Sequence, residues 1–429
     1  MQRIDSQDLR GKRVLVRVDF NVPLAEATVC DDTRIRAALP TIRYLQNNAA
    51  RIILMSHLGR PRGVGYEEEY SLAPVARVLS RMLGQEVPLA PYTDGMSDAS
   101  GADKAGASCV AGTNGLCGAA TAALAEALGE GEVLLLDNLR FDAREKANDA
   151  EFATELARLA DLYVNDAFGV AHRAHASVEA ITQLLPSFAG FLLDTEVTTL
   201  TTLLDTPERP FVAILGGSKV SDKIQILDAL LDSVDTLLIG GGMCFTFLKA
   251  QGLEIGRSLC EDEWLKRAVQ FIEKAAEKGV RLLLPVDLVA APFLAEDAPT
   301  KILSVDEMEA QLMGLDIGPA TQALYTRAIG EARTIFWNGP MGVFEMKPFE
   351  AGTRAVARAV AQQQNATSVV GGGDSIAAVR LFGVEDGIDF ISTGGGASLQ
   401  LLEGTPLVGV EALKQCARRQ AAQTGISEI

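Results

Sequence analysis

Short apolar stretches, each followed by a polar or glycine-rich turn and then by a helical pattern, recur along the whole chain. In the first half, the stretches with the composition of β-strands are residues 14–18, 51–55, 132–136 and 162–164. Helical periodicity marks residues 34–48, 71–84 and 149–160 between them. Strands that alternate with helices indicate parallel sheets with right-handed crossovers, so we expect an α/β fold.

The turns after the expected strands differ between the two halves of the chain. Aspartate, asparagine, serine, histidine and arginine follow the strands of the first half. In the second half, the strands 211–215, 236–239, 368–370 and 390–393 run into the glycine-rich turns 216–219, 240–242, 371–375 and 394–398. Ligands bind outside the carboxyl ends of parallel strands. We therefore expect a site made by side chains in the first half and a site made by backbone amides in the second.

The length of 429 residues fits two domains of about 200 residues each. Prolines at 186, 207 and 210 bracket a helical stretch at 192–204 that could bridge two lobes, which places the boundary near 186–210. We expect an N-terminal lobe at 1–188 and a C-terminal lobe at 189–407.

Residues 93–122 are mostly glycine, alanine, serine, threonine and aspartate, and we expect a flexible insertion that buries little surface. Cys109 and Cys117 lie within it. A redox role for these two thiols is one interpretation, but a tolerated surface insertion is the favoured one.

Composition narrows the class of protein. The chain carries 39 Lys and Arg against 56 Asp and Glu, a net charge of −17, which argues against nucleic-acid binding because that needs a broad basic face. Four of the first six residues are polar, and no apolar run approaches the roughly 20 residues of a membrane helix, so we expect a cytoplasmic protein without membrane attachment. The six cysteines show no CxxC pair and no zinc-ligand spacing, and we interpret them as reduced thiols.

All three histidines lie in two short segments that also carry arginine, residues 56–61 and 171–175. Clustered histidine and arginine side chains repel one another, and a small polyanionic ligand would offset this repulsion. Among the histidines, His57 is the strongest candidate, although a lone histidine is more often structural. The other candidates of this half lie near strand ends and are Asp19, Asn21, Arg34, Arg60, Arg140 and Arg173. Asp19 and Asn21 alternate along the end of the first strand, so we expect both to point the same way.

The glycine turns of the second half point to phosphate. One such turn often serves packing alone, but four at the expected starts of helices favour an anion site made by free amides and the helix dipole. The spacings of a P-loop, a dinucleotide-binding turn and a protein kinase are absent. Lys219 and Lys223 are expected on one face of the first helical turns, where a bound phosphate would offset their opposition to the dipole. Asp374 is expected to be an N-cap or a Mg²⁺ ligand.

Taken together and in this order, these segments resemble the phosphoglycerate kinase family over nearly the whole chain. The segments that carry the resemblance are VRVDFNVP at 16–23, SHLGRP at 56–61, NLRF at 138–141, VNDAFG at 164–169, AHRAH at 171–175, GGSKVSDK at 216–223, WNGPMGVFE at 337–345, GGGDS at 371–375 and STGGGAS at 392–398. Asp137 stands where the family usually has glutamate and Ser375 where it has threonine, and both keep the chemical type.

The resemblance implies two Rossmann-like three-layer lobes with parallel sheets, joined by a hinge helix, and a segment 408–429 that returns to the N-terminal lobe. It implies that the N-terminal lobe binds 3-phosphoglycerate or 1,3-bisphosphoglycerate through Asp19, Phe20, Asn21, Arg34, His57, Leu58, Gly59, Arg60, Arg140 and Arg173. It implies that the C-terminal lobe binds ADP or ATP with Mg²⁺, the metal on Asp374, through Gly217, Lys219, Lys223, Gly241, Phe293, Gly314, Leu315, Asn338, Val343, Glu345, Gly372, Gly373, Asp374 and Ser375.

The implied reaction is the reversible, direct in-line phosphoryl transfer of glycolysis between 1,3-bisphosphoglycerate and ADP, carried out by a monomer after hinge closure. Charge neutralisation is assigned to Arg34, Lys219, Gly372, Gly373, Gly395 and Gly396. No general base is expected, because the acceptor carboxylate is ionised near pH 7. Two other classes stay open, a dehydrogenase with an unusual dinucleotide site and a non-catalytic anion-binding protein. The paired lysines and Asp374 favour the enzyme.

Overall fold

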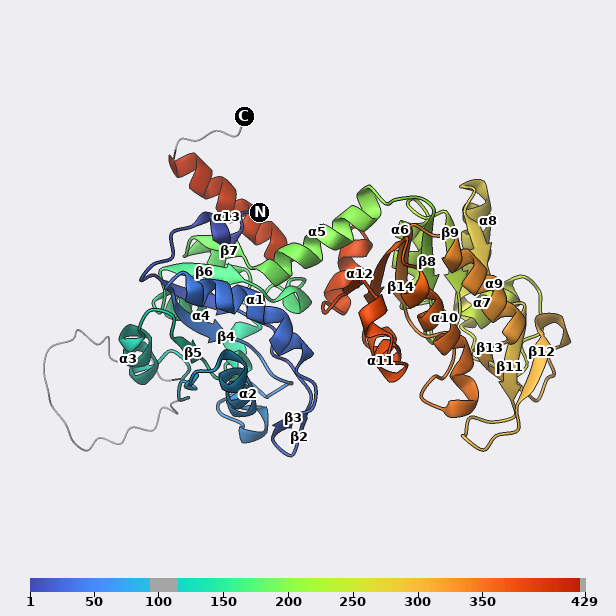
Figure 1. Cartoon of the computed structure of the whole chain (residues 1–429), viewed down its shortest axis with the longest axis horizontal. Helices are drawn as coiled ribbons and strands as arrows, with labels where there is room; N and C mark the ends of the chain where they lie inside the picture. Colours follow the sequence, from blue (N-terminus) through green and yellow to red (C-terminus); the bar gives the residue numbers. More distant parts are fainter. Residues whose placement is uncertain (93–114, 425–429) are drawn as a thin grey trace, which may run out of the picture. The chain divides into compact units, whose positions relative to one another are not determined.

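The computed structural model describes residues 1–92 and 115–424 (Figure 1). The chain divides into two compact units, one formed by Met1–Val197 with Pro406–Ile429 and the other by Thr198–Thr405. We call them the N-terminal and C-terminal units. The boundary falls inside helix α5, which spans Phe191–Asp205.

The N-terminal unit is built on a parallel sheet with the strand order β5-β4-β1-β6-β7. These strands are β1 (Arg13–Arg17), β4 (Arg51–Met55), β5 (Val133–Leu135), β6 (Leu162–Asn165) and β7 (Ser187–Ala189), and a short hairpin pairs β2 (Leu24–Ala25) with β3 (Thr28–Val29). The helices are α1 (Thr33–Asn47), α2 (Ala73–Leu83), α3 (Ala119–Ala127), α4 (Ala150–Ala157) and α13 (Val408–Thr424). Short 3-10 helices are η1 (Ile4–Ser6), η2 (Glu68–Tyr70), η3 (Leu139–Phe141), η4 (Ala143–Glu145), η5 (Phe168–Val170) and η6 (Ala180–Gln183).

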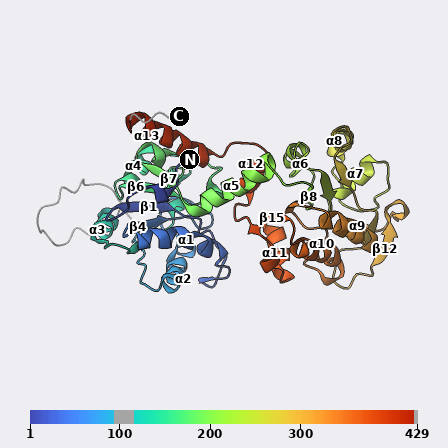
Figure 2. The same ribbon diagram turned by 45° about the horizontal axis from the view of Figure 1, so that its top comes forward.

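Strands β1 and β4 are buried on both faces, because valine, isoleucine and leucine occupy successive positions and both faces of a parallel sheet are covered. Val14 lies opposite Ile52, and both belong to one apolar core with residues of α1 and α2. Helix α13, from the far end of the sequence, packs beside β7 and close to the N-terminus (Figure 1, Figure 2).

The C-terminal unit repeats this plan with a parallel sheet in the order β10-β9-β8-β14-β15-β16. Its strands are β8 (Phe211–Leu215), β9 (Thr236–Ile239), β10 (Arg281–Leu283), β14 (Thr334–Asn338), β15 (Thr367–Gly371) and β16 (Phe390–Ile391). A small antiparallel sheet joins β12 (Lys301–Ser304), β11 (Asp287–Ala291) and β13 (Met313–Ile317). The helices are α6 (Ile224–Leu230), α7 (Cys244–Ala250), α8 (Leu265–Glu277), α9 (Pro319–Gly330), α10 (Ala351–Gln362), α11 (Gly373–Leu381) and α12 (Gly396–Leu402). The 3-10 helices are η7 (Asp262–Trp264), η8 (Val305–Glu307), η9 (Lys347–Phe349) and η10 (Glu385–Gly387).

In both sheets the strand order reverses beside the first strand of the unit. The reversal lies between β1 and β6 in the N-terminal unit and between β8 and β14 in the C-terminal unit. At such a switch point the connections leave in opposite directions and open a crevice at the carboxyl ends of the strands, where ligands bind in α/β proteins. The fold therefore places one such switch point in each unit.

The expected α/β fold is confirmed, and the strands and helices expected from the pattern are present with ends shifted by a few residues. Three local expectations are wrong. Helix α6 begins only at Ile224, with Lys223 at its N-cap position, so neither lysine lies within the helix. Gly372 caps α11, so Asp374 lies in the first turn and is not the cap. Strand β1 ends at Arg17, so Asp19 and Asn21 lie in the following loop.

Residues 93–122 were expected to form a flexible insertion that buries little surface, and this is wrong for residues 115–122. Leu116, Cys117 and Thr121 are buried, and α3 begins at Ala119. Burial raises the pKa of the Cys117 thiol, which keeps it protonated and poorly reactive. Residues 93–114, with Cys109, lie outside the described residues. The cysteines that the structure describes are free thiols.

Within residues 1–92 and 115–424, no helix combines the length and the apolar character that a bilayer crossing needs.

Helix α5 begins against a buried carboxylate of the N-terminal unit. Asp166 Oδ1 accepts hydrogen bonds from the backbone nitrogens of Leu192 at 2.9 Å and Leu193 at 3.2 Å. A Cβ on Gly190 would lie 2.7 Å from the Cβ of Asp166, so the approach of the two segments requires glycine. Burial raises the pKa of Asp166 to about 7, although these hydrogen bonds oppose the shift.

We expect Asp166→Asn to raise stability at pH 8 and to change it little near pH 4. Because the pKa of Asp166 is higher in the native state than in the unfolded state, protonation of this carboxyl stabilises the native state. This contribution to stability is lost as the pH rises from about 4 through about 7. Asparagine keeps the Oδ1 acceptor and carries no charge, so the gain at pH 8 should be on the order of 3 kcal/mol. Chemical denaturation at both pH values measures it. The exposed Asp205→Asn is the control, and a gain that does not depend on pH would contradict this account.

Candidate active site

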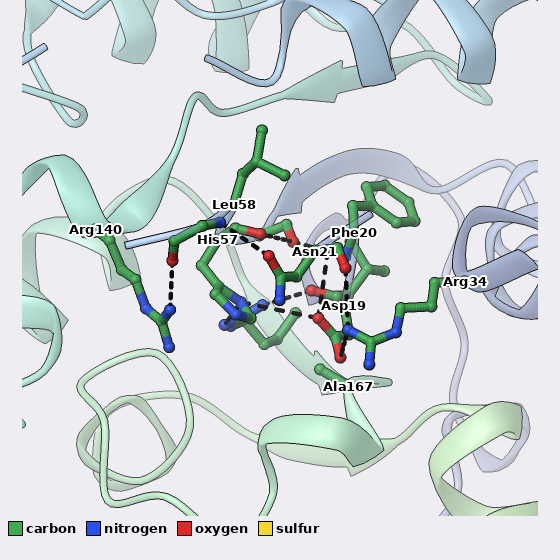
Figure 3. Close-up of polar contacts among 12 residues, drawn as sticks. Asp19, Phe20, Asn21, Arg34, His57, Leu58, Arg140 and Ala167 are labelled. Atoms are coloured by element: carbon green, nitrogen blue, oxygen red, sulfur yellow. Dashed lines mark hydrogen bonds and ion pairs between the residues drawn. The ribbon is translucent and has the colours of Figure 1, made fainter. Parts of the chain in front are cut away.

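The loops after β1 and β4 meet in the N-terminal unit and bring the first group of candidate residues together (Figure 3). Arg34, in the first turn of α1, pairs its Nη1 with Asp19 Oδ2 at 3.0 Å. The same nitrogen donates to the backbone oxygen of Asn21 at 3.1 Å. The side chain of Asn21 reaches the other loop, where its Oδ1 accepts from the nitrogen of Gly59 at 2.8 Å. These contacts fix a guanidinium at the edge of the switch-point crevice.

Arg140 joins this group from η3, the turn that follows β5. Its Nη1 donates to the oxygen of Gly59 at 2.7 Å, and the neighbouring Asn138 Nδ2 donates to the oxygen of Leu58 at 2.6 Å. Burial, together with the positive charges of Arg173 and Arg17, lowers the pKa of Arg140 to about 10. Arg140 therefore stays charged at neutral pH, at a cost that a bound anion would relieve.

His57 lies among these cations, and Figure 3 shows it and Asp19 between Arg140 and Arg34. The residue is only 2% exposed. Burial and then the charges of Arg17, Arg140, Arg173 and Arg34 hold the pKa of His57 well below its usual range. The ring is therefore neutral at physiological pH, and it serves as a hydrogen-bonding group and not as a cation.

The remaining candidates of this unit lie at different depths. Phe20 and Leu58 are buried beneath the loops, whereas Arg60 and Arg173 are exposed. Arg173 Nε lies 3.1 Å from His172 Nε2, and its charge acts on His57 and Arg140. Within the described part of the chain, no hydrogen bond or ion pair joins Arg60 to the other site residues.

A buried polar network beneath the cations was missed by the sequence analysis. Arg17 Nε donates to Ser177 Oγ at 2.9 Å, and Ser177 Oγ donates to Glu145 Oε1 at 2.6 Å. All three residues are fully buried. Burial opposes the charge of Glu145, but His175, Arg17 and Ser177 outweigh it and lower the pKa of this carboxyl. An arginine inside the apolar stretch 14–18 was the signal that could have revealed the network.

The C-terminal unit holds a cavity of about 450 Å³ next to its own switch point. Predicted nucleotide residues line it, and they are Gly217, Gly241, Gly314, Leu315, Val343, Glu345 and Asp374. Apolar side chains complete the wall, among them Phe245, Leu259, Leu288 and Met313. Phe293, which the sequence analysis placed here, is about half exposed and lies outside the lining, while its neighbour Leu294 lines the cavity. The cavity suits a flat apolar ring system with a polar end.

Glycine is required where the backbone segments of this cavity meet. Gly241 has φ +65°, and a Cβ on it would lie 2.6 Å from the backbone nitrogen of Gly217. A Cβ on Gly314 would lie 2.7 Å from Cε1 of Phe245. Side chains at these positions would close the space that the turns leave open.

Other residues predicted to bind the nucleotide lie around the carboxyl end of β14, at the polar end of the cavity. Lys223 Nζ donates to Asn338 Oδ1, and Asn338 Nδ2 donates to the oxygen of Gly371 at 2.8 Å. Ser375 Oγ accepts from the nitrogen of Gly339 at 2.5 Å. Burial lowers the pKa of Lys223, while Asp222 and Asp374 oppose the shift.

Other candidates at this end face outward. Lys219, Gly373, Asp374 and Gly396 are exposed, and Gly396 is the first residue of α12. Their polar groups are therefore accessible to solvent, and of these residues Asp374 is part of the cavity lining.

Asp374 fits the donor set that Mg²⁺ uses beside phosphates. Mg²⁺ takes one or two protein carboxylates and completes its shell with water and phosphate oxygens. The carboxylate of Asp374 is exposed at the cavity edge, in the first turn of α11. Among the described residues, no group of three or more metal-binding side chains forms a closed metal site.

Comparison with known proteins identifies the family. A sequence model of the family described as phosphoglycerate kinase matches residues 4–405. The chain belongs to the phosphoglycerate kinase family. The reaction of this family is the reversible phosphoryl transfer between 1,3-bisphosphoglycerate and ADP that gives 3-phosphoglycerate and ATP, a step of glycolysis.

Individual relatives agree with this assignment. A phosphoglycerate kinase of Moorella thermoacetica is 54% identical over 408 residues, which are 95% of this chain and 98% of the relative. One of Synechococcus elongatus is 51% identical over 418 residues, 96% of this chain and 98% of the relative. The structure of phosphoglycerate kinase from Coxiella burnetii matches with a TM-score of 0.83 and 43% identity, over 96% of this chain and 98% of that one. The structure of phosphoglycerate kinase from Pyrococcus horikoshii matches with a TM-score of 0.80 and 30% identity, over 97% of this chain and 100% of that one.

The buried network under the cationic site gives a stability prediction. We expect Glu145→Gln to lower the free energy of unfolding at pH 7 by about 3 kcal/mol, because it leaves Arg17 buried without its countercharge. A lowered carboxyl pKa stabilises the native state above its ordinary value of 4.5, and this contribution is lost as the pH falls through the lowered value. The cost of the substitution should therefore shrink only below pH 4.5. Urea denaturation at pH 7 and below pH 4.5 measures the loss of stability and its dependence on pH. Exposed Glu151→Gln is the control, and an equal loss in the two variants would refute the role of the network.

Proposed function

We propose that the N-terminal crevice binds 3-phosphoglycerate or 1,3-bisphosphoglycerate and that the C-terminal cavity binds ADP or ATP. The observation that carries this division is the different chemistry of the two switch points. One is lined by guanidiniums and a neutral imidazole, and the other by glycine backbone and an apolar wall that ends at Lys223 and Asp374. The first suits a small polyanion and the second a nucleotide.

In the N-terminal crevice, Arg34 and Arg140 are proposed to bind the charged groups of the glycerate, together with the exposed Arg60 and Arg173. Asp19 and Asn21 would bind its hydroxyl while holding Arg34 and the loop of Gly59. Clustered positive charge supports this assignment, because burial and then the charges of neighbouring arginines lower the pKa values of both His57 and Arg140. Carboxylate and phosphate groups are what a set of guanidinium forks binds best.

In the C-terminal cavity, the adenine is proposed to lie against Gly314, Leu315 and Val343, with Glu345 binding the ribose. The phosphates would extend toward Lys219, Lys223 and the turn 371–375. Gly314, Leu315, Val343 and Glu345 lie on the cavity wall, and the turn 371–375 contributes Asp374 to the lining. The two lysines are not part of the lining. The Mg²⁺ that accompanies the nucleotide would be held by Asp374 and phosphate oxygens and would neutralise phosphate charge.

The chemistry is proposed to be direct in-line transfer. The acceptor carboxylate is already ionised, so no side chain has to remove a proton. The protein's task is to align the two substrates and to balance the charge that spreads over the equatorial oxygens of the transferred group. We assign that task to Arg34, Lys219 and the amides of Gly372, Gly373, Gly395 and Gly396. Because the substrates bind to different units, we propose a hinge closure that joins them and excludes water.

A coupled assay for acyl-phosphate formation from ATP and 3-phosphoglycerate tests the proposed function directly. Turnover excludes the non-catalytic anion-binding alternative. Fluorescence titration with NADH tests the dehydrogenase alternative, and we expect no binding. We also propose that the enzyme works as a cytoplasmic monomer, which sedimentation of the purified protein would test.

We expect Arg34→Ala and Lys219→Ala each to reduce kcat on the order of 10³-fold, by analogy with the effect of an arginine that balances charge in the phosphoryl transition state. Steady-state kinetics of the coupled assay measure the loss, and thermal unfolding shows whether the variants are folded. Exposed Arg158→Ala is the control for loss of a positive charge. Near-normal turnover in either site variant would remove that residue from the mechanism.

The glycine turn at β15 offers a matched pair of variants. Gly373 is exposed, and a Cβ on it would meet no described heavy atom within 4 Å. We expect Gly373→Ala to keep or raise stability by up to about 1 kcal/mol and yet to lower kcat/KM about tenfold, because the methyl group stands where the phosphate approaches. Gly372→Ala should mainly destabilise, since Gly372 has φ +92° and its Cβ would lie 2.7 Å from Asn338 Nδ2. Wild-type kinetics in Gly373→Ala would contradict phosphate contact at this amide.

A further inference from the structure

The ring of His57 contacts a guanidinium that lies beneath the site. Arg17 Nη2 is 3.2 Å from His57 Nδ1. A guanidinium carries donors and no acceptor. A hydrogen bond at this contact can therefore form only if Nδ1 is the unprotonated nitrogen of the ring.

One carboxylate competes for the same nitrogen. Asp19 Oδ1 lies 3.8 Å from His57 Nδ1 and would favour a proton there. That distance exceeds the range of a hydrogen bond, and Asp19 is paired with Arg34 at 3.0 Å. The charges of Arg140, Arg173 and Arg34 also face the ring and disfavour its cationic form. The contact with Arg17 is therefore the one that decides where the proton lies.

Arg17 is held so that it cannot turn away from His57. Its Nε donates to Ser177 Oγ at 2.9 Å, and its Nη1 donates to the oxygen of Val18. The hydroxyl of Ser177 donates to Glu145 and so offers only lone pairs to Arg17. The backbone of Ser177 is itself fixed, because its nitrogen donates to Glu145 Oε2 at 3.0 Å and its oxygen accepts from Tyr163 at 2.7 Å. Each hydrogen bond between His57 and Glu145 thus has one possible direction: Arg17 donates to His57 and to Ser177, and Ser177 donates to Glu145.

We propose that Arg17, acting with Ser177 and Glu145, is a positioning residue that holds His57 as the neutral tautomer with its proton on Nε2. Among the described residues, no hydrogen bond occupies Nε2, so this N–H is available to a ligand. A carboxylate or phosphate has acceptors only, and the opposite tautomer would present a lone pair to it. The consequence for substrate rests on the proposed function of the N-terminal crevice, whereas the tautomer is a property of the free protein.

Nitrogen NMR of the ligand-free wild-type protein tests the tautomer. With ¹⁵N-labelled histidine the chain gives three imidazole spin systems, and the loss of one in His57→Gln assigns His57. We expect an unprotonated Nδ1 and a protonated Nε2 that persist from pH 8 down to pH 6.5, the ordinary pKa of the ring. A protonated Nδ1, a mixture of tautomers or an imidazolium in this range would overturn the proposal.

Removal of the donor tests the role of Arg17. Arg17→Met matches the arginine side chain as far as the position of Nε and removes all of its N–H groups. We expect the His57 spectrum to change to a mixture of tautomers and the KM for 3-phosphoglycerate to rise about tenfold, with the KM for MgATP changed less than twofold. Arg17→Lys keeps a charged donor and should recover part of both readouts. An unchanged His57 spectrum in folded Arg17→Met would overturn the assignment.

A second pair of variants covers the case in which Arg17→Met does not fold. The amide nitrogen of glutamine can occupy the Nε2 position of histidine, whereas asparagine reaches only the Nδ1 position. We expect His57→Asn to raise the KM for 3-phosphoglycerate at least fivefold more than His57→Gln does. Equal losses would overturn the proposal.

The two proposals fail separately. A wild-type protein with the expected His57 spectrum but without turnover of 3-phosphoglycerate would refute the proposed function and leave the tautomer established. An active wild-type protein with a protonated Nδ1 would refute the role of Arg17 alone.

Discussion

The cationic crevice depends on a pair of opposite charges buried beneath it. Arg17 and Glu145 are fully buried and are joined through the hydroxyl of Ser177. Removing two charges from water is costly unless each keeps hydrogen bonds and a countercharge, and this arrangement provides both. It also connects β1, η4 and the segment around Ser177, so the guanidiniums above it sit on a fixed base. The mutual repulsion of the site arginines can then be tolerated until an anion arrives.

The C-terminal unit solves a different electrostatic problem on the same sheet plan. The groups proposed to bind ligand in this unit are backbone amides and two lysines, and its glycine turns pack backbone against backbone, as at Gly241 and Gly217. Amides have no net charge, so they need no buried countercharge. This contrast fits two units that share the order of five strands and yet differ in the residues that follow β1 and β4 on one side and β8 and β9 on the other.

Much of the fold could be predicted, because strand and helix periodicity is local. Phe211–Leu215 and Thr236–Ile239 coincide with the expected strands. The antiparallel sheet of β11, β12 and β13 was missed, because β12 and β13 are partly exposed and their apolar pattern is interrupted. Helix starts were less predictable, since the starts of α6 and α11 depend on turns whose glycines have special backbone angles.

The sequence by itself determined the family, the α/β plan and most residues that gather at the two switch points, because these are carried by contiguous segments. Only the tertiary structure showed that Leu294 and not Phe293 lines the cavity, and that Cys117 is buried. It alone revealed the Arg17, Ser177 and Glu145 network, whose members are up to 160 residues apart. Contacts of this kind depend on which strands become neighbours, and no local pattern records that choice.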